Sequence, residues 1–223
     1  MKRLALFDLD HTLLSGDSDM LWCDLLVDAG LLDASFRERN AEMLRRYTAG
    51  TVTPVEFCDF YASTLGGREL SFWQTWRERL LVECVRPRIC ADARALLRRH
   101  REAGDVLVLT TATNRVITEL VARDLGADHH IATEVEVIDG RCTGRTSGVL
   151  NMRTGKVDRL RAWLAARGLD EVLLKQATFY SDSINDLPLL SAVGHPVVVD
   201  PDDRLHAAAL RHRWPVLRFD RRA

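Results

Sequence analysis

The sequence predicts an α/β fold: a doubly wound parallel sheet that carries an inserted all-helical segment and a small β-hairpin. Short apolar runs bounded by turn residues alternate with amphipathic helical patterns along most of the chain, and this alternation is typical of parallel sheets covered on both faces. One stretch of about 70 residues breaks the alternation, because it holds helical patterns but no convincing strand. A connection that long is not a loop, so it indicates an inserted helical unit.

Four apolar runs are expected to form strands buried on both faces, because they are short, continuous and bounded by turn residues. They lie at 3–9, 105–110, 177–181 and 196–200. Helices are expected wherever apolar residues recur at spacings of three and four. These stretches are 87–103, 114–125, 154–167 and 202–212.

The helical segment follows the first strand directly and holds amphipathic patterns at 19–29, 34–47 and 54–65. Boundaries near Ser15-Gly16 and Arg86-Pro87 divide the chain into two predicted domains. These are a core of residues 1–14 and 86–223 and a helical cap of residues 15–85. A small insert is also expected at 132–146, because Asp139-Gly140 stands between two alternating segments and favours a type I′ hairpin turn.

The composition excludes several classes of partner. A formal net charge of -1, with 28% charged and 47% hydrophobic residues, offers no basic field for nucleic acid or acidic membranes. Five cysteines form no CxxC pair and no even-numbered framework, so we expect reduced thiols in a cytoplasmic protein and no structural zinc. Asp8 and Asp10 cut the apolar start too early for a signal peptide, and no segment reaches transmembrane length.

Two pairs of carboxylates follow predicted strands. Asp8 and Asp10 come at the end of the first strand and point to the same side if the chain stays extended there. One aspartate of such a pair can act as a nucleophile and the other as a general acid and base, although aspartates are also common in turns. Asp182 and Asp186 follow the third predicted strand. Helix capping would explain Asp186 but leaves Asp182 without a structural role.

Thr110 and Lys156 are candidates for holding a phosphate. Thr110 ends the second strand, and a hydroxyl there, beside free N–H groups at a helix start, makes a phosphate cradle. Helix capping by Thr113 or Asn114 is compatible with that function. Lys156 follows Gly155 at a helix start, where the helix dipole disfavours a cation. Lysines are rare among the 31 basic residues, so this one suggests a need for a compact ammonium, unless it is a chance surface residue.

These groups gain weight in combination, because each lies at the carboxyl end of a predicted strand or at the start of the following helix. Parallel topology brings such positions into one crevice. Four carboxylates there would repel one another, each close pair by about 4 kcal/mol at 4 Å and an effective dielectric near 20. A divalent cation removes this repulsion, and oxygen-only ligands suit Mg²⁺, which also binds substrate phosphate.

The motifs resemble those of a known family. FDLDHTLL, the threonine that ends VLVLT, the later lysine and YSDSINDLPLL look like the four motifs of the haloacid dehalogenase superfamily, in order and over almost the whole chain. The placement of the helical insertion resembles the phosphoserine phosphatase branch. This resemblance implies a Rossmann-like core with a helical cap, and a magnesium-dependent phosphomonoester hydrolase.

By the same resemblance, Asp8 is expected to be the nucleophile that forms an aspartyl-phosphate. Asp10 would protonate the leaving alcohol and then activate water. Thr110 and Lys156 would hold the phosphoryl oxygens, with Thr111 as a further substrate contact.

The resemblance also implies a metal site. Mg²⁺ would be bound by Asp8, the main-chain carbonyl of Asp10 and Asp182, with Asp186 assisting. Asn185 is expected to contact the substrate. The cap would exclude water and contribute further substrate contacts.

The substrate is predicted less closely. Asp17 matches the acidic residue that phosphoserine phosphatases carry early in the cap. Those enzymes usually carry a serine followed by glycines at the second motif, where this chain reads TTAT from Thr110. They also carry a later cap arginine that binds the substrate carboxylate; spacing places Tyr61 there, with Arg45 or Arg46 as substitutes. Histidinol phosphate would need Asp17 but no such arginine, so it ranks alongside phosphoserine.

Other functions stay open at this stage. A dehalogenase or a phosphonate hydrolase would share the fold, but Asp10 is suited to protonating an alcohol leaving group. A receiver-like phospho-aspartate switch would also combine an aspartate, a threonine and a lysine around Mg²⁺. The chain length, the insertion and the pair of Asp182 and Asp186 argue against it. A small phosphomonoester is the one partner expected, and the oligomeric state is not predicted.

Overall fold

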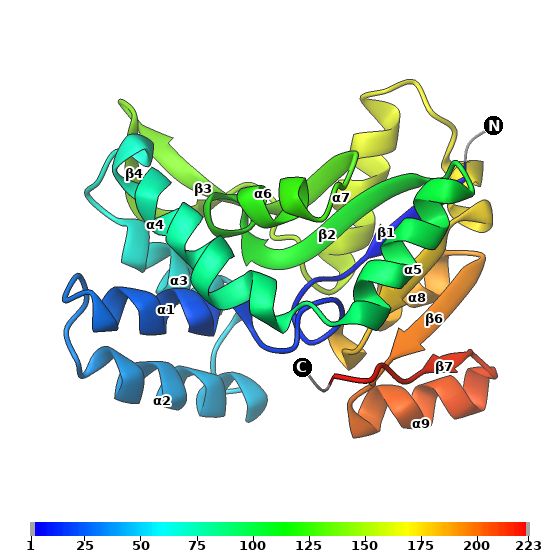
Figure 1. Cartoon of the computed structure of the whole chain (residues 1–223), viewed down its shortest axis with the longest axis horizontal. Coiled ribbons are helices and arrows are strands. Elements are labelled where there is room, and N and C mark those ends of the chain that lie inside the picture. Colours follow the sequence, from blue (N-terminus) through cyan, green and yellow to red (C-terminus); the bar gives the residue numbers. More distant parts are fainter. Residues whose placement is uncertain (1–2, 222–223) are drawn as a thin grey trace.

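The computed structural model describes residues 3–221. Its centre is a seven-stranded sheet in the order β4-β3-β2-β1-β5-β6-β7 (Figure 1). Neighbouring strands are parallel except β3 and β4, which pair antiparallel. The strands are β1 (Leu4–Phe7), β2 (Val106–Asn114), β3 (His129–Ile138), β4 (Arg141–Ser147), β5 (Thr178–Ser181), β6 (His195–Val199) and β7 (Val216–Leu217).

Alternation along β1 assigns its side chains to the two faces of the sheet. Leu4 and Leu6 join one buried cluster, whereas Ala5 and Phe7 join the other. All four are buried, as expected for a central strand covered on both faces. Each fully buried leucine contributes about 2 kcal/mol relative to exposure. The strand that carries the first motif is therefore firmly anchored in the core.

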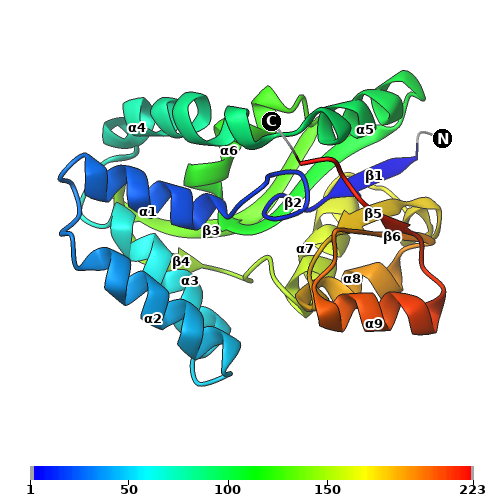
Figure 2. The same ribbon diagram turned by 60° about the horizontal axis from the view of Figure 1, so that its bottom comes forward.

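Helices cover both faces of the sheet, as a doubly wound arrangement requires. The cluster of Phe7 receives apolar residues from α5 (Ala91–Glu102) and α6 (Arg115–Asp124). The cluster of Leu6 receives them from α7 (Thr154–Ala165), α8 (Leu187–Ala192) and α9 (Asp203–His212). Figure 2 shows these two groups of helices on opposite sides of the sheet. The predicted fold class is confirmed.

The segment between β1 and α5 is helical throughout its regular structure. Its α-helices are α1 (Ser18–Asp28), α2 (Phe36–Thr48), α3 (Pro54–Ala62) and α4 (Gln74–Arg79). Short 3-10 turns at Ser63–Leu65, Leu70–Trp73 and Arg86–Arg88 and a π-helical turn at Leu80–Val85 complete it. The segment packs against β4 and α6. We keep the name cap for residues 15–85, whose boundaries stay a prediction.

The predicted hairpin grows out of a core strand. β3 runs parallel to β2 over its first half and then pairs antiparallel with β4. Asp139 and Gly140 have positive φ angles of 49° and 77°, as the two central residues of a type I′ turn require. Asp59 of α3 accepts hydrogen bonds from the N–H and the hydroxyl of Thr146 at 2.7 and 2.6 Å. The hairpin thus ties the cap to the sheet.

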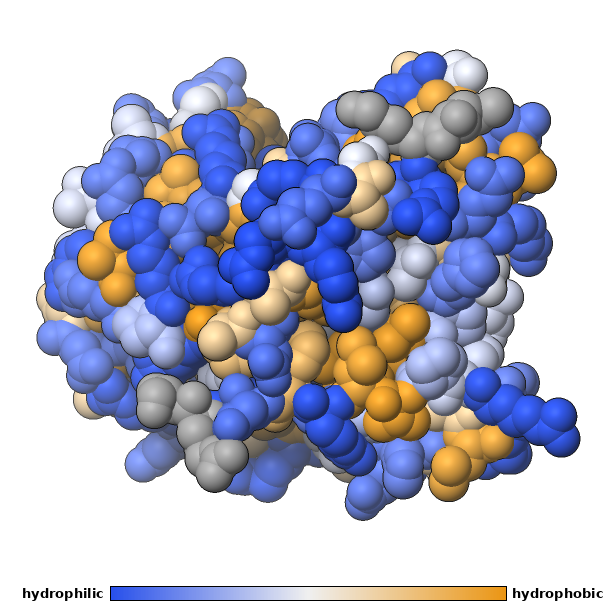
Figure 3. All heavy atoms as spheres, turned by 45° about the vertical axis from the view of Figure 1, so that its right-hand side comes forward, coloured by the Kyte–Doolittle hydropathy of each residue, from blue (hydrophilic) through white to orange (hydrophobic). Residues whose placement is uncertain are grey.

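The side of the molecule seen in Figure 3 is largely hydrophilic, with apolar residues in small separate patches. Among the described residues, no helix is both long and apolar enough to cross a bilayer. The five cysteines are free thiols in this structure.

Candidate active site

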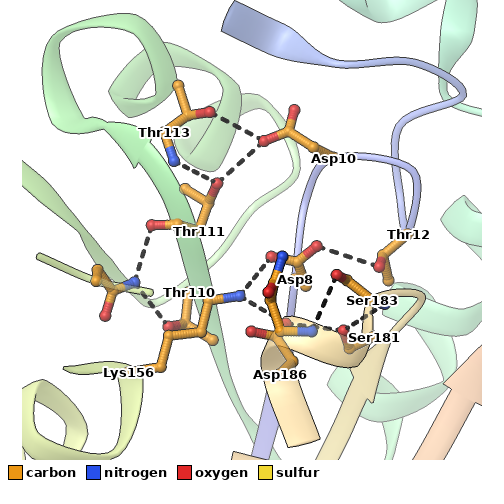
Figure 4. A network of polar contacts seen from close by, with 12 residues as sticks. Asp8, Asp10, Thr12, Thr110, Thr111, Thr113, Lys156, Ser181, Ser183 and Asp186 are labelled. Carbon is orange, nitrogen blue, oxygen red and sulfur yellow. Dashed lines mark hydrogen bonds and ion pairs between the residues drawn. The ribbon is translucent and has the colours of Figure 1, made fainter. Parts of the chain in front are cut away.

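Asp8 stands at the carboxyl end of β1, the middle strand of the sheet (Figure 4). Its Oδ1 accepts a hydrogen bond from Lys156 Nζ at 2.7 Å, and its Oδ2 lies 3.2 Å from Thr12 Oγ1. Only 6% of Asp8 is exposed. Burial raises the pKa of Asp8 to about 7, although the charge of Lys156 opposes this shift. Asp8 is therefore held in place by a cation beside it.

Lys156 is 2% exposed and donates to Asp8 and to Asp186 Oδ2, both at 2.7 Å. Burial lowers its pKa, but the two carboxylates outweigh burial, so the pKa lies above its usual value. The close packing of Gly155 helps to place it, because a Cβ there would lie 2.1 Å from the carbonyl oxygen of Leu150. Lys156 is thus no chance surface residue.

Thr12 links Asp8 to Asp182, which follows β5. Thr12 Oγ1 donates to Asp182 Oδ1 at 2.7 Å and accepts from the main-chain N–H of Asp182 at 3.0 Å. Burial, and then the charge of Asp8, holds the pKa of Asp182 well above its usual value. Lys156 therefore binds Asp8 and Asp186 directly, and Thr12 connects Asp182 to this group. We call these three carboxylates and Lys156 the lysine pocket.

Thr110 lies on β2, next to β1, and is fully buried. Its Oγ1 receives a hydrogen bond from Asn151 Nδ2 at 3.0 Å. The same amide nitrogen lies 2.9 and 3.0 Å from the carbonyl oxygens of Thr111 and Ile131, which can only accept, so the amide orientation is fixed. A nitrogen that donates cannot receive the hydroxyl proton of Thr110. That proton is left for another acceptor.

Asp10 has different partners from Asp8. Its Oδ2 accepts from Thr111 Oγ1 at 3.2 Å and from Thr113 Oγ1 at 3.0 Å, and its Oδ1 accepts from the N–H of Ser18 at 2.6 Å. Figure 4 shows Asp10 turned toward the two threonines of β2. Asp10 therefore lies where the core meets the first cap helix.

Asp17 and Asp19 extend this group of carboxylates. Asp17 Oδ1 caps α1 by accepting from the N–H of Met20 at 2.9 Å, and burial followed by the charge of Asp10 raises its pKa to about 7. Burial likewise holds the pKa of Asp19 well above its usual value. Asp19 Oδ2 lies 3.0 Å from Thr113 Oγ1, while its buried Oδ1 has no hydrogen-bond partner within residues 3–221. We call Asp10, Asp17 and Asp19 the acidic seam; no basic side chain of the described chain forms an ion pair with it.

The remaining predicted residues lie outside both groups. Asn185 is half-buried in the turn before α8. Tyr61 is buried in the cap, where its hydroxyl donates to Asn40 Oδ1 at 2.8 Å. Arg45 and Arg46 are exposed on α2. Neither arginine contacts the acidic seam.

The lysine pocket offers oxygen ligands for a cation. Within the described chain, no three His, Cys, Asp or Glu side chains converge as a complete metal site. The predicted Mg²⁺ ligands do not form such a cluster of three side chains. Asp10 would contribute its main-chain carbonyl, and Asp186 is held by Lys156. Asp8 and Asp182 both approach Thr12 Oγ1, at 3.2 and 2.7 Å, so two carboxylates from separate strand ends converge there while Lys156 contacts only one of them. Such an oxygen-only set fits Mg²⁺.

Around the lysine pocket and Thr110, three polar side chains were not predicted from the sequence: Thr12, Ser181 and Asn151. Thr12 and Ser181, which donates to Asp186 at 2.7 Å, lie inside the motifs quoted above, so their positions carried a signal. Asn151 carried none, because its partners on β2 and β3 are distant in the sequence.

Sequence comparison finds a family and a close relative. A sequence profile of haloacid dehalogenase-like hydrolases matches residues 5–191. A histidinol-phosphatase of Neisseria meningitidis is 38% identical over 221 residues, which cover 98% of this chain and 100% of that protein.

Structure comparison agrees with these matches. A Bordetella pertussis protein of unknown function superposes with a TM-score of 0.93 at 40% identity, covering 97% of this chain and 98% of that one. A substrate-bound phosphoserine phosphatase superposes with a TM-score of 0.70 at 16% identity, covering 99% and 94%. At that identity the likeness shows the fold alone.

Proposed function

Because this chain belongs to the haloacid dehalogenase-like hydrolases and is a phosphatase of that family, we propose that it hydrolyses a small amine-bearing phosphomonoester through an aspartyl-phosphate on Asp8. One observation carries the proposal. Asp8 stands at the carboxyl end of the central strand, 2.7 Å from a buried lysine and beside Asp182. This arrangement provides a nucleophile, a fixed cation for the phosphoryl group and ligands for a metal.

In the first step, a carboxylate oxygen of Asp8 attacks phosphorus while the bond between phosphorus and the alcohol oxygen breaks. Asp10 gives its proton to the departing oxygen, so a neutral alcohol leaves. Lys156 and Thr110 hold the phosphoryl oxygens. The hydroxyl proton of Thr110 is available for this, because Asn151 can only donate to that hydroxyl.

In the second step, Asp10 takes a proton from water, and the water oxygen attacks phosphorus of the aspartyl-phosphate. Phosphate leaves and the carboxylate of Asp8 is restored. Thr111 and Thr113 keep Asp10 in position for both transfers. Mg²⁺, held by Asp8, Asp182 and the carbonyl of Asp10, would supply positive charge against the phosphoryl group.

The acidic seam supports an amine-bearing substrate. Its buried carboxylates lack a cation, and a substrate ammonium would compensate their charge at the end of the site opposite the phosphate. Histidinol phosphate is favoured over phosphoserine, because Arg45 and Arg46 are exposed on α2 and are not placed to bind a substrate carboxylate. The 38% identical histidinol-phosphatase supports the same order.

The test measures phosphate release from p-nitrophenyl phosphate with Mg²⁺ and with EDTA. Asp8→Asn is expected to lower kcat by about 10⁴-fold or more, because it removes the covalent route. Asp139→Asn in the exposed hairpin turn is the matched control and should keep kcat within about twofold, as expected of a surface substitution. Histidinol phosphate and phosphoserine are then compared side by side.

Acid quenching with a labelled substrate distinguishes the alternatives. A short-lived, hydroxylamine-sensitive label on Asp8 is expected. A stable label without turnover would support a phospho-aspartate switch, and halide release without phosphatase activity would support a dehalogenase. Full activity of Asp8→Asn would overturn the mechanism.

A further inference from the structure

The chain segment after β7 lies against the loop that carries the first motif. Figures 1 and 2 both show the red end of the chain beside the dark blue loop that follows β1. The contact is made by Arg221. Its Nη1 donates to Ser15 Oγ at 3.0 Å, and its Nη2 donates to the carbonyl oxygens of His11 and Thr12 at 2.8 and 2.9 Å. A residue more than 200 positions away in the sequence thus forms hydrogen bonds with three residues of this loop.

The loop is tightly wound and strained. The carbonyl oxygen of Leu9 accepts from the N–H groups of Thr12, Leu13 and Leu14 at 3.2, 3.0 and 2.9 Å. His11 has a φ of 56°, which a side chain with a Cβ rarely adopts, and such a conformation persists only where neighbours hold it. Arg221 is one of those neighbours.

Thr12 connects Arg221 to Asp8 and Asp182. Its carbonyl is held by Arg221, while its hydroxyl lies 2.7 Å from Asp182 and 3.2 Å from Asp8, as Figure 4 shows for Asp8. A shift of Thr12 would therefore move both its contact with Asp8 and its contact with Asp182. Displacements of about 1 Å can reduce phosphoryl-transfer rates by about 10²-fold.

The other side of Arg221 is fixed by the loop after β6. Arg221 Nε donates to Asp200 Oδ2 at 2.8 Å, and Asp200 has a φ of 43°. Two residues further on, Asp202 donates its N–H to the carbonyl of Asp182 at 2.9 Å and accepts from the N–H of Ile184 at 2.8 Å. The β6 loop therefore supports the segment of Asp182 directly and the loop of Asp8 through Arg221.

We propose that Arg221, anchored by Asp200, is a positioning residue for phosphoryl transfer that holds the loop of Asp8 and Thr12 in register with Asp182. This inference rests on the proposed function. Arginine suits the role because its planar guanidinium presents five donors in fixed directions and meets four acceptors here, whereas a lysine ammonium is a single point.

The test compares Arg221→Ala and Arg221→Lys with Arg218→Ala. Arg218 belongs to the same segment and lies 3.8 Å from Asp200, but within the described residues it forms no hydrogen bond or ion pair with the motif loop, so it is the matched control. We expect kcat on p-nitrophenyl phosphate to fall about 10- to 100-fold in both Arg221 variants with KM changed less than about threefold. Arg218→Ala should stay within about twofold. Millimolar guanidinium should restore much of the kcat of Arg221→Ala.

A second readout does not depend on turnover. The rise in melting temperature caused by Mg²⁺ should be smaller in Arg221→Ala than in Arg218→Ala, because Asp8 and Asp182 are no longer held together. Equal Mg²⁺ shifts, a kcat within twofold of the parent, or an equal loss in Arg218→Ala would each overturn the proposal. If the parent protein hydrolysed no phosphomonoester, the proposed function would fail. The rise in melting temperature caused by Mg²⁺ would still test whether Arg221 positions Asp8 and Asp182.

Discussion

The lysine pocket and the acidic seam are both groups of buried and half-buried carboxylates, but they differ in charge balance. In the lysine pocket, Lys156 donates to two of the three carboxylates at 2.7 Å. In the acidic seam, hydroxyl and main-chain N–H groups are the partners of Asp10, Asp17 and Asp19. The difference teaches where cations have to come from. The pocket carries a cation of its own, whereas under the proposed function the seam receives its cation from the substrate ammonium.

This contrast matches the two ends of the proposed substrate. A phosphoryl group brings negative charge and meets Lys156, Thr110 and a metal ion. An ammonium brings positive charge and meets carboxylates whose burial is unfavourable as long as no cation lies beside them. Variants that alter the charge of one group at a time therefore separate the two ends.

After Asp8→Asn, the largest effect is expected for Lys156→Met, which removes the fixed cation of the pocket. We expect kcat/KM to fall about 10³-fold, as after loss of a preorganised donor to a developing charge. The unfolding free energy should also fall by about 3 kcal/mol, because Asp8 and Asp186 are left buried without their partner. Steady-state kinetics and urea unfolding provide the two measurements.

Lys175→Met is the matched control for that variant. Lys175 is exposed and donates to the carbonyl oxygen of Ala192 on another part of the surface. Its replacement should leave kcat/KM within about twofold. If Lys156→Met kept more than a tenth of the parental activity, the cation of the lysine pocket would not be needed for catalysis, and the contrast with the acidic seam would fail.

A smaller but more selective loss is expected in the acidic seam. Asp17→Asn and Asp19→Asn should each lower kcat/KM for histidinol phosphate about 10- to 100-fold, since a buried ion pair with the substrate amine is lost. Hydrolysis of p-nitrophenyl phosphate, which has no amine, should change less than about threefold. Asp24→Asn on the exposed side of α1 serves as the control. Equal losses on both substrates would remove these residues from the specificity site.

The sequence predicted the lysine pocket better than the seam, and the reason is topological. The predicted strand at 177–181 is observed at Thr178–Ser181, and the residues that follow it lie at the same edge as Asp8 because the strands are parallel. In a parallel sheet, residues that follow different strands lie close together, and this can be predicted without knowing any side-chain contact. Asp8, Lys156 and Asp182 could therefore be brought together from their positions alone.

The seam could be predicted only in part, because it forms where the cap meets the core. Asp17 was found by resemblance, but Asp19 also needed the rotation of α1 against β2, which sequence periodicity does not give. The sequence predicts helix capping by Thr113 or Asn114; Asn114 caps α6, whereas Thr113 contacts Asp10 and Asp19. The sequence pattern at 132–146 predicts a hairpin alone, whereas β3 begins at His129 and its first half pairs parallel with β2.

Stability should respond to pH through the seam. The pKa of Asp17 is raised to about 7, above its unfolded value, so the folded state binds more protons between pH 4 and 7 and loses stability as the pH rises through that window. Asp17→Asn removes this penalty and keeps the helix cap. We expect it to raise the unfolding free energy at pH 8 by about 1–2 kcal/mol, since Asp17 is only partly buried, and by less at pH 4. Equal gains at both pH values in urea unfolding would show that charge is not the cause.

The smallest effect is expected at Arg153, on the loop that leads to Lys156. Its φ of 52° and ψ of -129° suit glycine far better than a residue with a Cβ. The side chain reaches the cap, where Nη2 donates to the hydroxyl of Tyr47 at 3.3 Å and the guanidinium lies 5.4 Å from the ring centre. The loop thus combines backbone strain in the core with a contact to the cap.

Arg153→Gly is expected to stabilise the fold by about 1 kcal/mol, because strain of about 1–3 kcal/mol outweighs the extra chain entropy of glycine. It should also raise KM a few-fold, since the contact that links the pocket to the cap is lost. Arg213→Gly, at a left-handed residue that ends α9, is the matched control and should give a similar gain with unchanged KM. If Arg153→Gly lowered stability, the contact with Tyr47 would be worth more than the strain, and Arg153 would serve mainly to hold the cap in place.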